Sequence, residues 1–153
     1  MPHVRPAARA IIIQNEKLLC VKMRDHTGEF FVFPGGGQQH GESAHQALKR
    51  ECLEELGVEV EIHELMVARD YIGSNHEYKE LHPEFHALEL FFRCSVPAGF
   101  SPRNGHSPDT QQVEVVWVPL EELEGLLLYP KPLRTMLRNI GHGVWPAYLG
   151  DVN

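Results

Sequence analysis

A helix that directly follows a run of glycines is the feature that most constrains the fold of this 153-residue chain. Residues 33–37 read FPGGG, and glycines at this density permit positive φ angles and let a carbonyl or an N–H point inward. Ser43 stands at the N-cap position with Gln46 three residues later, which predicts a capping box, and Gly57 predicts the helix C-terminus. Residues 44–56 contain no proline or glycine. We therefore predict a glycine loop followed by one capped helix.

Carboxylates gather on one face of this helix. Glu51, Glu54 and Glu55 share a face because residues three and four apart are neighbours on a helix. Such crowding is tolerated when a cation sits among the carboxylates, and oxygen ligands of this kind suit Mg²⁺ or Mn²⁺. Arg50 can neutralise and orient them without being a ligand itself. With the glycine loop and the helix N-terminus, this pattern indicates a site for a metal-bound polyphosphate. The apolar stripe expected to pack on a sheet is Leu48, Cys52 and Leu56.

Residues 36–58, the signature segment, resemble the Nudix box of the Nudix hydrolases, G-x5-E-x7-R-E-U-x-E-E-x-G-U, in which U is bulky or aliphatic. All fixed positions of that pattern are filled, by Gly36, Glu42, Arg50, Glu51, Glu54, Glu55 and Gly57. Val58 fills the last apolar position, and Cys52 keeps a small hydrophobic side chain at the first. At about one in twenty per residue, chance agreement would occur roughly once per billion starting positions.

This resemblance implies a fold and an activity for most of the chain. The fold would be α+β, with a mixed β-sheet sandwiched between α-helices, in a single domain over residues 1–153. The activity would be hydrolysis of a pyrophosphate bond in a nucleoside diphosphate linked to another moiety, with one to three Mg²⁺ or Mn²⁺ ions and an activated water. The partner would be a small nucleotide substrate.

The resemblance also implies roles for the residues of the signature segment. The metal ligands would be the Gly35 carbonyl, Glu51, Glu54 and Glu55. Glu51 would be the first candidate for the general base, with Glu54 and Arg50 completing the catalytic group. Gly36, Glu42 and Gly57 would brace the loop and the helix.

Three alternatives compete for the function. A diphosphate-linked compound, such as a nucleotide sugar or an ADP-ribose-like molecule, is slightly favoured because the long polar loop over 70–84 offers space for a second moiety. A nucleoside triphosphate, including an oxidised one, suits the short chain. A catalytically silent nucleotide sensor would usually have lost box carboxylates, and none is lost here. Neither the downstream proline of the ADP-ribose group nor a clean tyrosine signature for dinucleoside polyphosphates stands at its expected spacing.

Substrate contacts are expected from two loops, over 70–84 and 97–112. Aromatic rings there could stack a base and cationic groups could contact a phosphate. The candidates are Tyr71, His76, Tyr78, Lys79, His82, Arg103 and His106. Asp109 or Glu114 could add a further carboxylate to the metal cluster.

Composition restricts the partners and the compartment. A formal net charge of −7 argues against nonspecific binding to nucleic acid or to an anionic membrane. The sequence contains no run of 18 apolar residues and no apolar stretch typical of a signal peptide near its start. Its three cysteines lack metal-ligand spacing and suggest reduced thiols in the cytoplasm. We expect a monomer or a homodimer.

Hydrophobic periodicity predicts the remaining elements. Strands are expected over 10–13 and 17–22 as a hairpin, and over 30–33, 58–69, 84–96 and 113–118. Short helices are expected from Pro119 and over 132–140. The aromatic tail, residues 141–153, is expected to pack on the domain or on a partner subunit.

Overall fold

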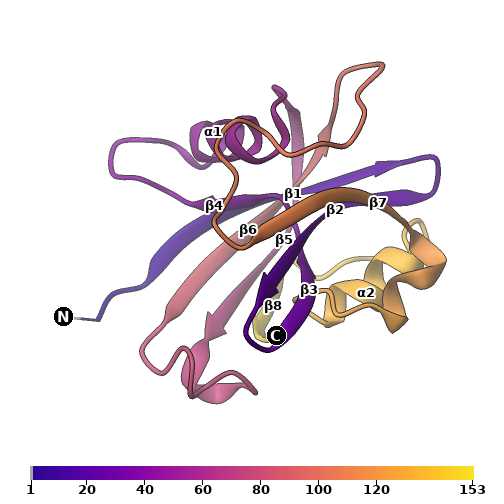
Figure 1. Ribbon diagram of the computed structural model, residues 1–153. Coiled ribbons are helices and arrows are strands. Elements are labelled where there is room, and N and C mark those ends of the chain that lie inside the picture. Colours follow the sequence, from indigo (N-terminus) through magenta and orange to yellow (C-terminus); the bar gives the residue numbers. More distant parts are fainter. Residues whose placement is uncertain (1) are drawn as a thin grey trace.

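The computed structural model describes residues 2–153, which form a mixed α+β fold (Figure 1). The strands are β1 (Arg5–Gln14), β2 (Lys17–Asp25), β3 (Gly28–Val32), β4 (Gly35–Gly37), β5 (Glu61–Ile72), β6 (His86–Ser95), β7 (Gln112–Pro119) and β8 (Tyr148–Asp151). The α-helices are α1 (Ala44–Leu56) and α2 (Pro132–Arg138), and the 3-10 helices are η1 (Gly73–Asn75) and η2 (Leu120–Gly125). The strand order is β3-β2-β1-β6-β5-β8, with β4 added to β1 and β7 to β2. The predicted mixed sheet between helices is confirmed.

The first two strands form the predicted hairpin, and both are longer than predicted. Asn15 and Glu16 turn the chain with φ angles of 51° and 59°. Two consecutive positive φ angles match the right-handed twist of the strands that they join. The strand predicted from residue 58 begins at residue 61, because the chain must first leave the helix through Gly57, whose φ is 73°.

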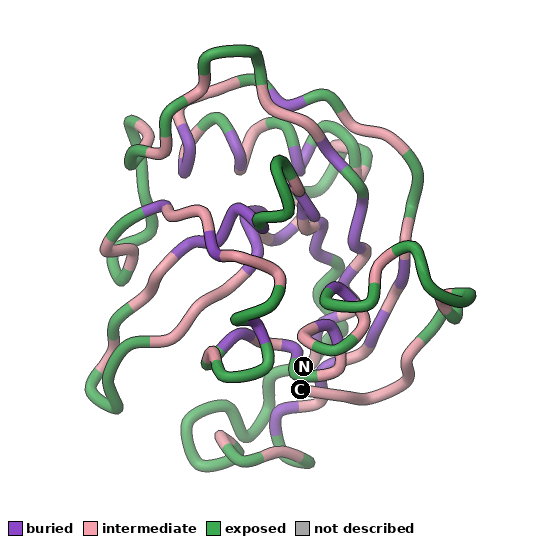
Figure 2. Tube along the Cα trace, turned by 90° about the vertical axis from the view of Figure 1, so that its right-hand side faces the viewer, coloured by how far each residue is buried: buried purple, intermediate pink, exposed green. Residues whose placement is uncertain are grey.

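Helix α1 has the predicted ends and the predicted buried stripe. The Ser43 Oγ accepts from the Gln46 N–H, while the Ser43 N–H donates to the Gln46 side chain. Leu48, Cys52 and Leu56 are fully buried against one face of the sheet. Figure 2 shows the same result, because burial recurs along α1 on the side that faces the strands.

The two faces of the sheet pack against different helices, and one of them also borders a cavity. β1 pairs in parallel with β6, with Ala7 opposite Glu89 and Arg9 opposite Phe91. Because strand side chains alternate between faces, the odd-numbered residues of both strands lie on the face opposite α1. That second face packs against a separate apolar cluster that includes α2, and it also borders a cavity. Helices α1 and α2 accordingly lie on opposite sides of the sheet (Figure 1).

The glycine segment was predicted to be a loop, and this prediction is wrong. Residues 35–37 form strand β4, which pairs antiparallel with residues 7–9 of β1. A Cβ on Gly35 would lie 2.1 Å from the Ala8 carbonyl oxygen, so only glycine can approach β1 this closely. The absence of side chains therefore allows pairing in a segment whose composition suggested a loop.

The tail packs on its own domain. Strand β8 pairs in parallel with β5, and the Val152 N–H donates to the Asp70 carbonyl at 3.1 Å. The Asp151 carboxylate accepts from the Ile72 N–H at 2.9 Å. Trp145 and Leu149 pack against the apolar cluster beside α2.

Deleting residues 148–153 should lower the free energy of unfolding by about 2 kcal/mol or more, because several hydrogen bonds at about 1 kcal/mol each are lost with β8. Urea denaturation measures this loss, and a sizing column reports the oligomeric state. Val144→Ala is the matched control, because Val144 is 97% exposed in the same tail. Unchanged stability in the truncated chain would contradict the packing described for the tail.

Within residues 2–153, no helix has the length and apolar character needed to cross a membrane.

Candidate active site

Arg50 holds the start of the signature segment to α1. Its Nη2 donates to the Glu42 Oε1 at 2.7 Å and to the Gly37 carbonyl at 3.1 Å. Its Nη1 donates to the Glu51 Oε1 at 3.0 Å and lies 3.5 Å from the Glu54 Oε1. The hydrogen bonds to Glu42 raise the pKa of Arg50 further above its usual range. One guanidinium thus contacts three carboxylates and the end of β4.

Glu55 is a buried carboxyl group among other carboxylates. Its side chain accepts from the Gly35 N–H at 3.1 Å, and the residue is only 8% exposed. Burial raises its pKa to about 8, and Glu51 and Asp109 add to this rise. The Arg9 guanidinium and the Gly35 N–H act in the opposite direction and do not offset burial.

Each glycine of β4 lies against a different neighbour, and only Gly35 meets backbone atoms. A Cβ on Gly36 would lie 2.6 Å from the Glu51 Cδ, and one on Gly37 would lie 2.2 Å from the Arg5 Nη2. Gly35 also has a φ of 131°, which side chains disfavour. The glycine backbone of β4 therefore separates two charged groups, with the Glu51 carboxylate against Gly36 and the Arg5 guanidinium against Gly37.

A buried network of ion pairs joins β1, β5 and β6 next to β4. The Arg9 Nε donates to the Glu89 Oε2 at 2.8 Å, and the Arg69 Nε donates to the Glu89 Oε1 at 2.7 Å. Burial alone would raise the pKa of Glu89, but the two guanidiniums hold it below its usual range. The Arg9 Nη1 also donates to the Gly35 carbonyl at 2.9 Å. The network thereby connects β6 to the glycine strand.

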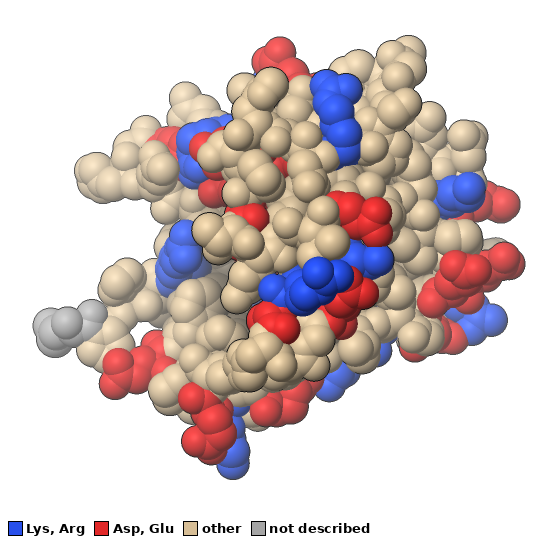
Figure 3. Space-filling model, viewed as in Figure 1, with Lys and Arg blue, Asp and Glu red and all other residues tan. Residues whose placement is uncertain are grey.

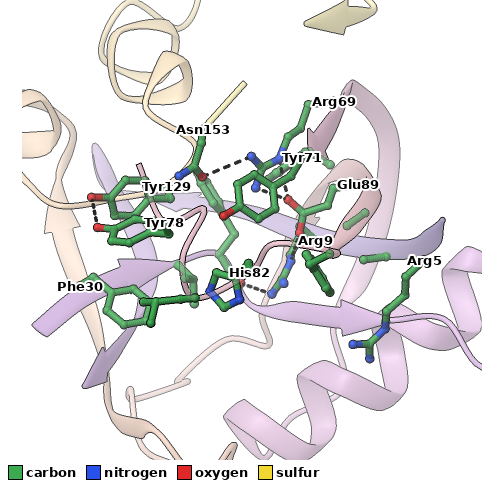
Figure 4. A pocket seen from close by; sticks show the side chains of 18 of the residues that line it. Arg5, Arg9, Phe30, Arg69, Tyr71, Tyr78, His82, Glu89, Tyr129 and Asn153 are labelled. Carbon is green, nitrogen blue, oxygen red and sulfur yellow. Dashed lines mark hydrogen bonds and ion pairs between the residues drawn. The ribbon is translucent and has the colours of Figure 1, made fainter. Parts of the chain in front are cut away.

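A cavity of about 260 Å³ opens beside these residues on the face opposite α1. Arg5 and Arg9 lie on one side of it (Figure 4), with the Arg5 guanidinium against Gly37 and the Arg9 guanidinium at the Gly35 carbonyl. The opposite side is aromatic, with the Tyr78 and Tyr129 hydroxyls hydrogen-bonded to each other at 2.7 Å. The aromatic residues of the lining are Phe30, Phe33, Tyr71, Tyr78, His82, Phe85, Phe91 and Tyr129. The cavity can therefore receive a planar group at one end and an anionic group at the other.

Comparison with known proteins agrees with this geometry. The family model described as NUDIX domain matches residues 3–140. The chain belongs to the Nudix hydrolase family. Membership in this family supports a Nudix-type pyrophosphohydrolase. A search of curated proteins found no match.

Solved structures of Nudix hydrolases share the fold. A NUDIX hydrolase from Nitrosomonas europaea has a TM-score of 0.72 at 23% identity, covering 94% of this chain and 93% of its own. An ADP-ribose pyrophosphatase from Streptococcus suis has a TM-score of 0.65 at 19% identity, covering 99% and 100%. A MutT NUDIX hydrolase from Burkholderia pseudomallei has a TM-score of 0.67 at 21% identity, covering 90% and 98%. At these identities the likeness concerns the fold.

The structure separates the predicted substrate residues of this Nudix hydrolase into two groups. Tyr71, Tyr78 and His82 line the cavity. Arg103 does not line it. That exposed residue lies at the C-terminal end of α1, where its Nη2 is 3.5 Å from the Gly57 carbonyl.

The other candidate side chains have local contacts or lie on the surface. His76 contacts the Asp151 carboxylate at 2.6 Å. Glu114 pairs with Lys22 at 2.7 Å on the surface. Lys79 and His106 are exposed. Asp109 lies near enough to Glu55 to affect its pKa.

The oxygen ligands of the Nudix box suit a divalent cation, although they are not gathered around one point. Across residues 2–153, no three His, Cys, Asp or Glu side chains stand ready to hold a metal ion together. Glu51 and Glu54 are instead turned toward Arg50. Burial, with a smaller contribution from neighbouring carboxylates, raises the pKa of Glu55, and a bound divalent cation would offset both effects by favouring the charged form. The donor set therefore fits Mg²⁺ or Mn²⁺ once Glu51 and Glu54 turn away from Arg50.

Sequence reasoning missed the charged residues on the cavity face of the sheet. Arg9, Arg69 and Glu89 each lie within a strand, and Glu89 and Arg69 are buried. A usable signal was present, because a lone acidic residue in the apolar strand β6 implies a buried cationic partner. The partner itself could not be identified without the strand register.

Proposed function

We propose that this Nudix hydrolase cleaves the pyrophosphate bond of a nucleoside diphosphate linked to another moiety, of the nucleotide-sugar or ADP-ribose type. The observation that carries the proposal is the position of the cavity. It adjoins Gly37, one residue from the glycine that contacts Glu51. A substrate whose ring occupies the aromatic end could therefore place its diphosphate along β4, beside the box carboxylates.

The size of the cavity supports one ring system inside it and a second moiety outside. At about 260 Å³ it is slightly smaller than the usual range for pockets that enclose a drug-sized ligand. The aromatic lining suits a nucleobase, since stacking needs only a planar face. The part of the substrate beyond the diphosphate would then extend from the cavity toward solvent.

The box residues would hold the metal and orient the reacting groups. Glu51, Glu54, Glu55 and the Gly35 carbonyl would hold Mg²⁺ or Mn²⁺, and the Gly35 oxygen keeps a second lone pair while it accepts from Arg9. When bound, such an ion neutralises phosphate oxygens and lowers the pKa of a coordinated water. Glu51 would accept the proton of the attacking water, because it lies against Gly36 and is the less exposed of the two carboxylates that contact Arg50 on α1. Arg50 and Glu42 would keep the helix and β4 in register.

A nucleotide panel tests this proposal. The purified chain is incubated with Mg²⁺ and ADP-ribose, nucleotide sugars, dinucleoside polyphosphates and nucleoside triphosphates, including oxidised ones. Release of a nucleoside monophosphate from a diphosphate-linked compound is expected, and pyrophosphate release from triphosphates alone would instead select the triphosphate branch. Binding without cleavage of any compound would select the silent sensor.

We propose that the enzyme is located in the cytoplasm, because Cys20, Cys52 and Cys94 are all free and buried thiols. Nucleic acid is not expected as a partner, and the face in Figure 3 agrees, because its basic side chains mostly lie beside acidic ones. Monomer and homodimer both suit the proposal, and the sizing column distinguishes them.

A further inference from the structure

Arg5 lies at the cationic end of the cavity with its charge uncompensated. Among residues 2–153 it forms no ion pair and no side-chain hydrogen bond, and its side chain borders the cavity. The guanidinium lies against Gly37, since its Nη2, Nε and Cζ are 2.2, 2.3 and 2.5 Å from the position of a Cβ there. A guanidinium that lies over the backbone and has no hydrogen-bond or ion-pair partner can use all of its N–H donors to bind an anion.

Arg9 presents a second guanidinium to the same end. Its Nε and Nη1 donate to Glu89, Phe33 and Gly35, whereas its Nη2 has no partner in the described part of the chain. Although this side chain belongs to the buried network, 25% of it is exposed, and it lines the cavity. Arg5 and Arg9 lie on the same face of β1 because they are four residues apart in a strand.

The charges around the cavity favour an anionic group at this end. Arg5, Arg9 and Arg69 line it together with only two acidic side chains, Asp25 and Glu89. Glu89 is already shared between two of these guanidiniums. The charge that no carboxylate offsets is positive and belongs to Arg5, whose guanidinium lies against Gly37. Figure 4 shows Arg5 and Arg9 on the side of the cavity away from Tyr78 and Tyr129.

We infer that Arg5, assisted by the Arg9 Nη2, binds the phosphoryl group of the moiety that occupies the aromatic end of the cavity. This inference rests on the proposed function, which places a diphosphate at β4, and it identifies the residues that select a phosphorylated ligand over the bare nucleoside. Gly37 positions the guanidinium, because any side chain at residue 37 would displace it.

Binding without metal tests the inference separately from catalysis. ADP and adenosine, and UDP and uridine, are titrated into the full chain in EDTA by isothermal titration calorimetry. The wild type should bind at least one diphosphate more tightly than its nucleoside. Arg5→Ala should weaken diphosphate binding about tenfold and leave nucleoside binding nearly unchanged. Arg5→Lys should recover part of the loss, because charge is kept while the fork of donors is not.

A double variant tests the role of Gly37. Gly37→Ala should weaken diphosphate binding in the wild-type background, because its methyl group would displace the Arg5 guanidinium. In the Arg5→Ala background the guanidinium that the methyl group would displace is absent, so no further loss is expected. The backbone φ of Gly37 is not positive, so alanine introduces no strain of its own there. Equal losses from Gly37→Ala in both backgrounds would overturn the positioning role.

Arg93→Ala is the matched control, because it removes the same charge from an exposed pair with Glu64. A similar loss in Arg93→Ala would show a general charge effect and overturn the inference. An equal loss for nucleoside and diphosphate in Arg5→Ala would show a structural role and overturn it as well, as would a wild type that binds both ligands equally. Failure of the proposed function appears separately, as a Mg²⁺ panel without cleavage while diphosphate binding in EDTA persists.

Discussion

Glu54→Gln and Glu55→Gln are each expected to lower turnover by at least about a hundredfold and to leave the fold intact. Each change removes a charged oxygen ligand from the proposed metal cluster while side-chain volume is kept. The measurement is kcat with saturating Mg²⁺ on the substrate that the nucleotide panel identifies, with circular dichroism to report folding. Glu54 is 40% exposed as a side chain, so its substitution should hardly affect stability.

Glu59→Gln is the matched control for these two variants. Glu59 lies three residues beyond the end of α1, is exposed, and lies outside the signature segment. Its substitution removes one negative charge at a similar place in the chain and should retain wild-type turnover. Near-wild-type turnover in both Glu54→Gln and Glu55→Gln would refute the proposed metal cluster.

Mg²⁺ binding gives a readout that does not depend on turnover. An ion that binds only the folded chain raises its melting temperature as its concentration rises. The wild type should show this increase, and Glu55→Gln should show much less of it. An equal rise in melting temperature in the wild type and in Glu55→Gln would show that the ion does not bind at Glu55.

Helix α1 could be predicted from the sequence because its determinants are local. The capping box needs only Ser43 and Gln46, and the helix end needs only Gly57. The spacing of the carboxylates follows from helix geometry alone. The contact between Arg50 and Glu54 could be predicted for the same reason, because the two residues lie four apart, one turn of the helix.

The cavity could not be predicted because distant strands assemble it. Arg9 meets Glu89 only because β1 pairs in parallel with β6, and a shift by one residue would place Glu89 on the other face. Tyr129 reaches Tyr78 from a segment 51 residues away. The hydrophobic pattern of one sequence predicts where strands occur, but it does not predict which residues of two strands pair with each other.

The glycine strand shows how composition can mislead. Consecutive glycines usually indicate a loop, since they weaken strands by entropy and offer no side chains for packing. In β4 the same lack of side chains leaves room for the β1 backbone, for Glu51 and for Arg5. Only the positions of those neighbours show that Gly35 is needed for space and that side chains fill the room left at Gly36 and Gly37.

Glu55→Gln should also raise the stability of the metal-free enzyme at alkaline pH. Burial raises the pKa of Glu55 from 4.5 to about 8 in the folded state, so the unfolded chain loses this proton first as pH rises. The wild type is therefore fully stabilised by the protonated carboxyl below about pH 4.5, loses that stability progressively as pH rises, and reaches its minimum above about pH 8. Each pKa unit corresponds to about 1.4 kcal/mol, so the full effect is on the order of several kcal/mol.

Urea denaturation in EDTA from pH 5 to pH 9 measures this difference. The glutamine side chain of the Glu55→Gln variant would not titrate, and its amide oxygen can still accept from the Gly35 N–H. The gain over the wild type should therefore grow with pH and be smallest at pH 5. Glu59→Gln should show no such pH-dependent gain, because Glu59 is exposed. A gain that is constant across this range would refute a buried, proton-linked Glu55. If the gain grows with pH as expected, one substitution both stabilises the metal-free enzyme and lowers its turnover about a hundredfold or more, as expected for a carboxylate buried at a cost in stability so that a cation can bind it.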